Sequence, residues 1–389
     1  MEIKYFLVLL FVFLFPFVSS AHYITGYVND ALDSTAANNH EVMLWNYITG
    51  GVDNITAVIG PAGSAGVDNV YLIDCELLDT PCKKNDILTL KVYDTGDTYV
   101  SKEVNVTVST FGYDLVENMT LNSPPIFQNT LVDDSFNLTL DEIDLIANST
   151  RKVICSSVVE DLDGDSLISS ISSFYSDSSF YSDSDDNNYH YTNNSCEINS
   201  SYGNENESLI TCSYDIFYYA IPETWNCEIH ANDSLSRGLG IDTTSVNPLL
   251  SIGVVDSVNF TSQVENVSDE VEIVISNFGN VPIDLSLYGY GSVVDDGLAM
   301  DCVGDKDIPI YYKKYNLTSS IFGNLTLEEF ESTYENLTSS PVISEFNLNL
   351  RQDDFIFEAF KSTYWRIYVP RGISKTCSGN IVFGAVESI

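Results

Sequence analysis

The amino-acid sequence predicts an all-β protein made of sandwich domains in tandem. Short runs of alternating Val, Ile, Leu and Tyr recur along the chain between turns rich in Gly, Asn and Asp, which is the pattern of half-buried strands. At 389 residues the chain is also too long for one compact core. Its eight cysteines and three tryptophans divide among three successive segments. Each segment can therefore build its own core and carry its own covalent clamp.

Residues 1–21 have the features of an export signal. A start that bears Lys4 is followed by an apolar run over residues 5–18, and Ser19 and Ala21 satisfy the small-residue rule for cleavage after Ala21. The run is short for a membrane-spanning helix, and no later stretch is long and apolar enough to span a bilayer. We expect a secreted or cell-surface protein with no membrane insertion after cleavage; retention of the segment as an anchor is the less favoured alternative.

The charge of the chain excludes one class of partner. With 16 basic and 56 acidic residues, the formal net charge is −40. A surface of that sign repels nucleic acid and anionic lipid, so neither is expected as a partner. It attracts divalent cations instead.

Residues 22–121 form the first segment. They open with "YITGYVND", continue through "HEVMLWN" and close with "ILTLKVYD" and "KEVNVTVSTF", all of which are strand-and-turn patterns. The sequence "NSPPIF" occupies residues 122–127. Paired prolines continue neither a strand nor a helix, so an extended linker is expected there.

Residues 128–246 form the second segment. Strands are expected around "RKVICSSVV", "ESLITCSYDIFYYA" and "TWNCEIHAND". Between the first two lies a stretch rich in Ser, Asp and Tyr, which predicts a long exposed hairpin or loop.

Residues 247–389 form the third segment, with strands around "EVEIVISNFGNVPIDLSLYG" and "STYWRIYVPRG". One short helix is expected in "TLEEFESTYENLTS". Thr326 and Glu329 make a capping box there, and an apolar face is shared by Leu327, Phe330 and Tyr334.

The cysteines are expected to form disulfides, because an even number in an exported chain favours them and the four histidines offer no zinc-binding spacing. Two cysteines fall in the first segment and two in the third. This division pairs Cys75 with Cys82 and Cys302 with Cys377. Three pairings stay open among the four in the second segment, which are Cys155, Cys196, Cys212 and Cys227.

Asn-x-Ser/Thr sequons are unusually dense. Random ordering of the 33 Asn and 72 Ser and Thr residues would give about six, and the chain has fourteen. We therefore expect N-glycosylation on exposed turns, the alternative being chance in an Asn- and Ser-rich composition. The sequons are at Asn54, Asn105, Asn118, Asn137, Asn148, Asn193, Asn199, Asn206, Asn232, Asn259, Asn266, Asn316, Asn324 and Asn336.

Several stretches resemble known cell-surface modules. "VICSSVVEDLDGDSL", "YYAIPETWNCEIHANDS" and the terminal "YWRIYVPRGISKTCSGNIVFGAV" resemble secreted archaeal cell-surface proteins, S-layer-like or adhesin-like, that are built from immunoglobulin-like β-sandwich repeats. The opening "ITGYVND…HEVMLWN" resembles a carboxypeptidase-regulatory or transthyretin-like domain, and "VISNFGNVPIDLSL" an adhesion-type module. The resemblance covers most of the mature chain and implies an extracytoplasmic glycoprotein.

The immunoglobulin-like resemblance also implies a pairing in the second segment. "TWNC" follows "YYA" as the aromatic-rich late strand of such a sandwich does, and "VIC" stands where an early strand faces it. This implies a Cys155–Cys227 bond between sheets, which leaves Cys196–Cys212 to pin the base of a neighbouring hairpin.

The run "VVEDLDGDSL" has two interpretations, a solvated Asp-Gly turn, which is favoured, and a calcium site with an architectural role. It is not an EF-hand, because the glycine is fourth from Asp161 instead of sixth and Ser172 stands at the twelfth position. It resembles the D-x-DGD-x-L sequence of cadherin-like domains, although the paired linker acids of that family are absent. Calcium needs six to eight oxygen ligands, and this stretch offers only about three or four from side chains, which favours the turn. The expected ligands are Glu160, Asp161, Asp163, Asp165 and Asp233.

No sequence feature predicts catalysis. Asp94-Thr95-Gly96 matches the triplet of aspartic proteases, but those enzymes need two such carboxylates and no second Asp-Thr/Ser-Gly occurs. "GPAGSAG" at residues 60–66 lacks the first glycine of a serine hydrolase elbow. Carboxylate pairs for glycoside hydrolysis are always present among 56 acids and indicate little.

The sequence therefore predicts a non-catalytic, exported, structural or adhesive cell-surface glycoprotein with no cofactor other than structural calcium. Its expected partners are other envelope proteins, further copies of itself or surface glycans. The alternative is a secreted glycan-binding module that uses tyrosine-rich loops such as residues 174–191, and an acidic extracellular hydrolase is the remote alternative.

Overall fold

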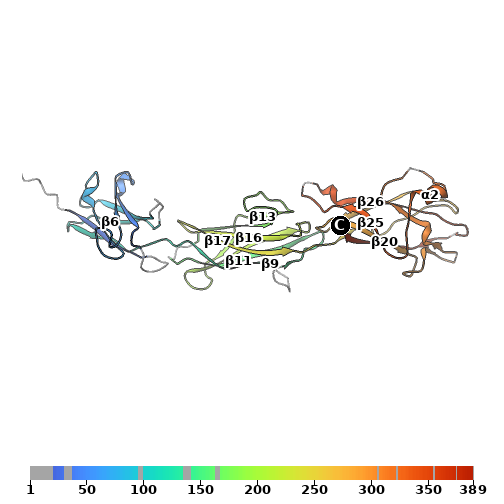
Figure 1. The fold of residues 1–389 in the computed structure, drawn as a ribbon, viewed down its shortest axis with the longest axis horizontal. Helices are drawn as coiled ribbons and strands as arrows, with labels where there is room; N and C mark the ends of the chain where they lie inside the picture. The colour runs from blue at the N-terminus through green and yellow to red at the C-terminus, as the bar shows by residue number, and fades with distance from the viewer. Residues whose placement is uncertain are drawn as a thin grey trace, which may run out of the picture.

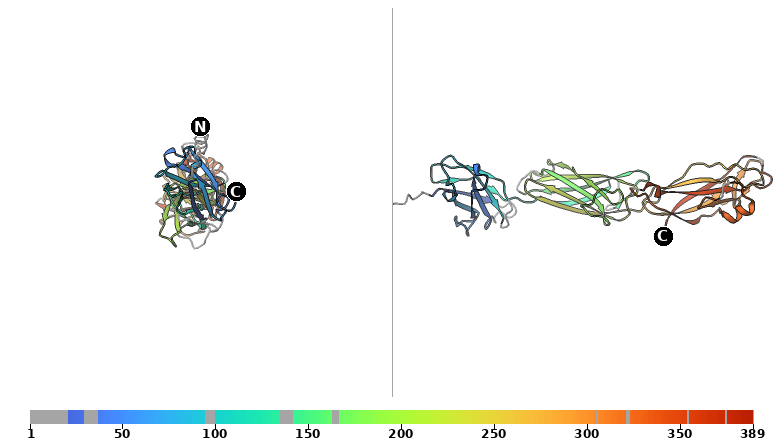
Figure 2. Two further views of the ribbon diagram at one scale, coloured as in Figure 1. Left: turned by 90° about the vertical axis from the view of Figure 1, so that its left-hand side faces the viewer. Right: turned by 90° about the horizontal axis from the view of Figure 1, so that it is seen from above.

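The computed structural model describes residues 21–29, 37–94, 100–134, 142–162, 167–304, 306–320, 323–353, 355–373 and 375–388. Within these ranges the protein is nearly all β, and α2 (Leu327–Thr333) is the one α-helix. The prediction of an all-β fold is confirmed. Three β units follow one another along the long axis of an elongated molecule (Figure 1), which is narrow when seen end-on (Figure 2).

The first domain, residues 21–121, packs two sheets face to face. Their strand orders are β4-β1-β7, with β8 also paired to β1, and β3-β2-β5-β6. Its buried core is drawn only from residues 24–121. The elements are β1 (Tyr23–Asn29), β2 (Glu41–Asn46), η1 (Tyr47–Thr49), β3 (Asn54–Val58), β4 (Val70–Asp74), η2 (Cys75–Leu77), β5 (Ile87–Tyr93), β6 (Val104–Thr107), β7 (Tyr113–Leu115) and β8 (Met119–Thr120).

The second domain, residues 126–246, is a sandwich with strand orders β10-β17-β16-β12-β13 and β14-β15-β11-β9. Buried and exposed positions alternate along its long strands, as expected where one face meets a core. The strands are β9 (Ile126–Asp134), β10 (Glu142–Ile143), β11 (Thr150–Glu160), β12 (Ser169–Ser176), β13 (His190–Asn193), β14 (Glu197–Asn199), β15 (Glu207–Phe217), β16 (Thr224–Asn232) and β17 (Arg237–Val246).

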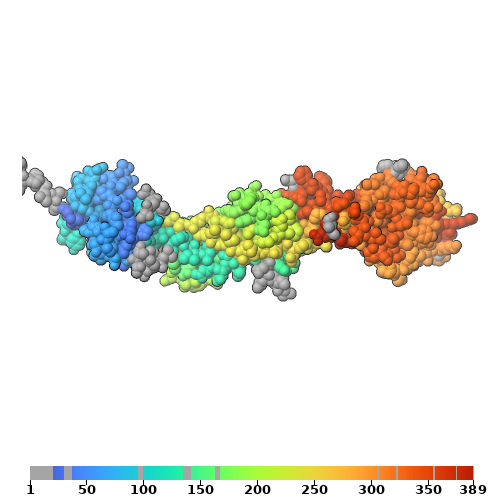
Figure 3. All heavy atoms as spheres, viewed as in Figure 1, coloured from blue at the N-terminus to red at the C-terminus, as the bar shows by residue number. Residues whose placement is uncertain are grey.

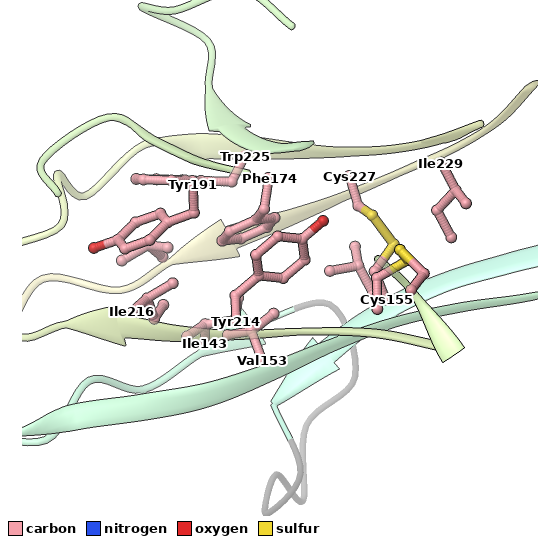
Figure 4. Packing of buried hydrophobic residues seen from close by; sticks show 14 of the residues in the cluster. Ile143, Val153, Cys155, Phe174, Tyr191, Tyr214, Ile216, Trp225, Cys227 and Ile229 are labelled. Carbon is pink, nitrogen blue, oxygen red and sulfur yellow. A yellow bond between two sulfur atoms is a disulfide. The ribbon is translucent and has the colours of Figure 1, made fainter. Parts of the chain in front are cut away.

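An aromatic stack fills the middle of this sandwich (Figure 4). Trp225 is fully buried, with its ring 4.8 Å from that of Phe174 and 6.0 Å from that of Tyr191. The indole Nε1 donates to the carbonyl of Ile221 at 2.9 Å, so its polar atom is satisfied inside the core. Burial of one such side chain contributes about 2–3 kcal/mol.

The third domain, residues 250–388, has one five-stranded sheet, β18-β19-β26-β23-β24, and two three-stranded sheets, β25-β20-β28 and β22-β21-β27. Its elements are β18 (Ile252–Gly253), β19 (Val271–Asn277), β20 (Ile283–Tyr290), β21 (Leu298–Cys302), β22 (Ile308–Pro309), η3 (Ile310–Tyr312), β23 (Lys313–Asn316), α2, β24 (Glu335–Asn336), β25 (Val342–Leu348), η4 (Ile356–Ala359), β26 (Phe360–Ile367), β27 (Cys377–Ser378) and β28 (Asn380–Glu387).

Helix α2 begins where the sequence predicts. The Thr326 hydroxyl accepts from the Glu329 N–H while the Glu329 side chain accepts from the Thr326 N–H, which is the expected capping box. Phe330 and Tyr334 are buried, but Leu327 is exposed. The expected apolar face is therefore reduced to Phe330 and Tyr334, which pack in one small cluster with Val267.

Two local expectations differ from the structure. Residues 126 and 127, placed in the linker, already belong to β9, because Phe127 packs against the second core. The stretch between the first strands of the second domain is a hairpin of β12 and β13, but its strands are not exposed. Phe174, Tyr191 and four serines of β12 are buried in it.

Candidate functional site

Of the predicted calcium ligands, Glu160, Asp161 and Asp233 are described, and they lie at the end of the second domain that faces the first. Glu160 ends β11 and Asp233 follows β16. The N–H of Ile168 donates to the carbonyl of Asn232, the residue before Asp233, at 2.8 Å. Asp163 and Asp165 lie outside the described residues.

The described carboxylates at this end have structural partners. Asp233 Oδ1 accepts from the backbone N–H groups of Leu235 and Ser236, and its Oδ2 accepts from the Ser236 hydroxyl at 2.6 Å. Glu160 Oε2 accepts from Gln128 Nε2 at 2.6 Å. Asp161 is buried. Within the described ranges no three side chains of metal-binding type are grouped for an ion, and calcium stays a prediction.

The tyrosines of residues 174–191 do not form a flat exposed platform. Tyr175 donates its hydroxyl to Glu228 at 2.9 Å, and burial together with this hydrogen bond raises the pKa of Tyr175 to about 12. Tyr191 is buried, and the edge of the Tyr181 ring meets His230 with centroids 4.6 Å apart. The rings thus serve packing, as in half-buried strand tyrosines generally.

An acidic hollow of about 470 Å³ opens beside this hairpin. It reaches from the second domain to Asp353 of the third. His190 is fully buried behind it, with Nδ1 3.4 Å from Asp185. The lining residues are Ser178, Ser179, Asp183, Ser184, Asp185, Asp186, Tyr189 and Asp353.

A fully buried asparagine of the second domain locks the joint to the third. Asn188 Nδ2 donates to the carbonyl of Tyr219 in its own domain and, at 3.0 Å, to the carbonyl of Arg351 in the third. Its Oδ1 accepts from the N–H of Asp353 at 3.0 Å. The Asn188 amide therefore bonds to the second and the third domain at once.

A second fully buried asparagine mirrors it from the third domain. Asn280 Nδ2 donates to the carbonyl of Ala220 at 2.9 Å and to that of Asn247 at 3.1 Å. Its Oδ1 accepts from the N–H of Leu249 at 2.6 Å. These bonds tie the connecting segment and the second domain to one side chain.

Ring contacts complete the joint between the second and third domains. The Arg351 guanidinium lies 4.9 Å from the centroid of the Tyr219 ring, and the rings of Tyr218 and Phe278 meet edge to face at 6.0 Å. A joint with satisfied buried polar groups and packed rings has one favoured geometry.

The joint between the first and second domains is looser. Asn122 Nδ2 donates to the Ser236 hydroxyl at 2.9 Å. Pro125 passes so close to β17 that a Cβ on Gly238 would stand 2.0 Å from its carbonyl oxygen, so glycine is required there. A hollow of about 280 Å³ remains between the first domain and Leu235.

The disulfides join the pairs favoured by the sequence analysis. Cys75–Cys82 clamps a loop of the first domain, and Cys155–Cys227 connects the two sheets of the second (Figure 4). Cys196–Cys212 ties the start of β14 to β15, and Cys302–Cys377 ties β21 to β27 in the third domain.

The sequon asparagines lie at the surface. Thirteen of the fourteen are in the described ranges, and none of the thirteen is buried; Asn137 lies outside. The described asparagines that are buried stand in no sequon, namely Asn46, Asn69, Asn188, Asn277 and Asn280. Asparagines with a structural role are thus separate from those open to modification.

The protease-like triplet has little support from its surroundings. Asp94 is exposed, and its carboxylate lies 3.6 Å from His40 Nδ1. Thr95, Gly96 and Asp97 lie outside the described residues. Among the described helices none is long and apolar enough to cross a membrane.

Comparison with known proteins finds no matching family model and no matching curated protein. Among solved structures, the chain resembles the major pilin subunit of Bacillus cereus at 10% identity and a TM-score of 0.27, covering 79% of this chain and 96% of that one. It resembles the T6 backbone pilin of Streptococcus pyogenes at 10% identity and a TM-score of 0.25, covering 93% and 95%.

A third likeness is to a chaperone–tip adhesion subunit complex of Csu pili from Acinetobacter baumannii. The identity is 10% and the TM-score 0.30, over 63% of this chain and 96% of that one. TM-scores this low carry no functional argument. The function is therefore inferred from the chain's own residues.

Proposed function

We propose that this protein is an extracellular structural or adhesive glycoprotein whose rod-like second and third domains hold a fixed separation at a cell surface. The joint built around Asn188 and Asn280 carries this proposal. A chain that only needed to tether two domains would leave such a joint solvated and mobile. Here two fully buried amides bond across it.

Glycosylation fits the same role. The sequons fall in all three domains, and every described one is at the surface. Glycans spread along a rod would shield its strand edges from pairing with other chains, which is a hazard of exposed β-structure. The high negative charge adds mutual repulsion between rods.

The rigid joint leads to a first prediction. Replacing Asn188 and Asn280 together with alanine is expected to uncouple the second and third domains, because it leaves buried backbone groups without partners at about 1–3 kcal/mol each. Calorimetry should then show separate unfolding transitions for the second and third domains where these two unfold together in the parent protein, and small-angle scattering should show a broader range of lengths.

Asn277→Ala is the matched control. Asn277 is as deeply buried, but its side chain bonds only within the third domain, donating to the carbonyls of Val281 and Asn349 and accepting from the Gly279 N–H. It should destabilise that domain and leave the two domains coupled. An unchanged single transition in the double variant would refute the rigid rod.

Calcium at the looser joint is proposed as a second brace. Support comes from the buried Asp161 and Asp233 beside the linker. Millimolar calcium is then expected to raise the melting temperature of the second domain and lengthen the scattering profile, and Asp163→Asn/Asp165→Asn should abolish both effects. Identical melting curves with calcium and with chelator would show that the stretch "VVEDLDGDSL" is a solvated turn and not a calcium site.

A further inference from the structure

The outer face of one sheet in the first domain carries aromatic residues that do not belong to the core. Sheet β3-β2-β5-β6 buries Leu44 and Val92 on its inner face. Trp45 and Tyr93 directly follow them, so they point to the opposite face. Each is only 7% exposed, yet neither belongs to the core cluster. These rings therefore form a second apolar surface in this domain, which is the blue end of the molecule in Figure 3.

A hollow of about 450 Å³ is lined by both rings. Tyr47, whose side chain is 62% exposed, adds a third aromatic wall. Gly50 and Gly51 leave one side open, because a Cβ on either would meet no other part of the protein within 4 Å. A hollow of this size, with aromatic walls and a few polar groups, can hold a small organic ligand. The remaining lining residues are Met43, Asn54, Thr89 and Glu103.

One lining residue is the asparagine of a sequon. Asn54 is exposed at the start of β3 and lies directly opposite Trp45 of β2. Residues directly opposite each other in an antiparallel pair place their side chains on one face, with Cβ atoms about 5 Å apart. Asn54 Nδ2 donates one hydrogen to the carbonyl of Gly51 at 2.7 Å. A glycan replaces only the other amide hydrogen, so this bond can persist after modification.

Asn105 provides a comparison on the same face. One row of opposed residues crosses the sheet from Asn54 through Trp45 and Thr89 to Asn105. Asn105 is also an exposed sequon asparagine, but it lies at the other edge of the sheet and does not line the hollow. Its Oδ1 accepts from the Thr89 hydroxyl at 2.8 Å. Glycans on the two asparagines would thus start from one face, and only the glycan on Asn54 would start inside the hollow.

We propose that the N-linked glycan of Asn54 folds back into this hollow, where its first sugars lie against Tyr47. The C–H groups of a sugar ring carry partial positive charge, which suits the negative face of an aromatic ring. Glu103 offers carboxylate oxygens to the sugar hydroxyls. The glycan then covers Trp45 and becomes part of the first domain. This inference rests on the glycosylation assumed in the proposed function.

Attachment at the hollow favours this occupant over a free saccharide or a second copy of the chain. A sugar tethered at Asn54 has an effective concentration on the order of millimolar, so even weak contacts keep it bound. A sugar without charge also meets no repulsion from this acidic protein. A second copy would bring the same acidic surface, which opposes close contact.

Protection from a glycosidase tests the position of this glycan. The mature protein is secreted from a eukaryotic cell line and treated with peptide N-glycosidase, and glycopeptide mass spectrometry follows release at each site. Only a glycan outside the hollow is open to the enzyme. Release from Asn54 should therefore be at least about fivefold slower than release from Asn105 in the folded protein, and equal to it after denaturation. Equal rates in the folded protein, or an Asn54 without glycan, would overturn the inference.

Removal of the sequon tests what the glycan contributes to stability. Thr56→Ala removes the glycan and keeps Asn54, whereas Thr56→Ser keeps both, and the side chain of Thr56 is exposed. The alanine variant should melt about 5 °C below the serine variant in the first domain, which corresponds to the same fivefold preference. The same two substitutions at Thr107, also exposed, remove or keep the glycan of Asn105. They should give equal melting temperatures.

A double-mutant cycle tests the contact with Tyr47. Tyr47→Ser should destabilise the first domain in the Thr56→Ser background and have no effect in the Thr56→Ala background, where the sugar is absent. Ile48→Ser is the matched control, because Ile48 lies in the same short helix and is 88% exposed but does not line the hollow. It should act equally in both backgrounds. Equal losses for Tyr47→Ser in both would exclude Tyr47 as the contact and overturn the inference.

This outcome and the outcome for the rigid joint are independent. Calorimetry of the joint tests Asn188 and Asn280, which stand in no sequon and lie outside the first domain. Protection at Asn54 tests only the first domain. Either proposal can therefore fail while the other holds.

Discussion

Replacing Cys155 and Cys227 with alanine is expected to lower the free energy of unfolding of the second domain by about 4 kcal/mol. The bond spans 72 residues of sequence and joins β11 to β16 across the core. Without it the unfolded chain regains the freedom of a long loop, and the cost of confining that loop grows with its length. For a domain of ordinary stability, only a small free energy of unfolding would remain.

Cys75→Ala/Cys82→Ala is the matched comparison, because that bond spans only seven residues. Its removal should cost about 2 kcal/mol on the same reasoning. Urea unfolding followed by tryptophan fluorescence, with one tryptophan in each domain, measures both losses. Equal losses for the two variants would show that loop length does not set the stabilisation in this protein.

Lys313→Met is expected to stabilise the third domain by about 2 kcal/mol at pH 7. Lys313 on β23 is fully buried, and its Nζ donates to the carbonyl of Ala299 at 2.8 Å. Burial lowers the pKa of Lys313 from its ordinary 10.5 to about 8. A shift of that size corresponds to about 3 kcal/mol against the charged form, from which about 1 kcal/mol is subtracted for the lost hydrogen bond.

The same lysine makes stability depend on pH. Between about pH 8 and pH 10.5 the amine is neutral in the folded protein and still charged in the unfolded chain. The unfolded state then binds more protons, so the free energy of unfolding rises with pH across this window. The methionine variant should lose this rise, while Lys361→Met, at an exposed position, should keep it. A rise of equal size in all three proteins would exclude Lys313 as its source.

Glu270 makes the stability of the third domain depend on pH in the acidic range, with an effect no larger than that of Lys313. Burial alone would raise the pKa of Glu270, but hydrogen bonds from Tyr334, Ser320 and Ser319 outweigh it and hold the pKa below its usual value. The stability that this carboxylate provides is therefore present at neutral pH and declines in acid. Tyr334 also accepts from the buried Arg366, so the network anchors the segment after α2.

Local patterns determined the elements that depend on near neighbours. Alternation of period two located most long strands, because each strand buries one face and the burial of successive side chains must alternate. The capping box at Thr326 and Glu329 located the start of α2, since both partners lie within one turn. The division of cysteines among segments favoured Cys75–Cys82 and Cys302–Cys377, because each of those segments holds only two cysteines.

Only the tertiary structure decided which asparagines hold the joint. Asn188 and Asn280 look in sequence like other asparagines, and their partners lie 60 or more residues away at Ala220 and Arg351. The sequon pattern marks asparagines that stay at the surface, but it does not tell which of the others become buried. Packing of one domain against the next makes that selection.

The sequence by itself therefore determined the all-β class, the acidic charge and the apolar residues and cysteines of three separate cores, while the export signal stays a prediction. The fold alone brought Ile48, Leu77 and Phe111 to one end of the first domain and buried Lys313 on β23 against Ala299. Composition and hydrophobic periodicity can be read directly along the chain. They predict strands because residue propensities and the burial of one strand face depend on nearby residues. Convergence of distant loops depends on how whole sheets stack, and no local pattern encodes it.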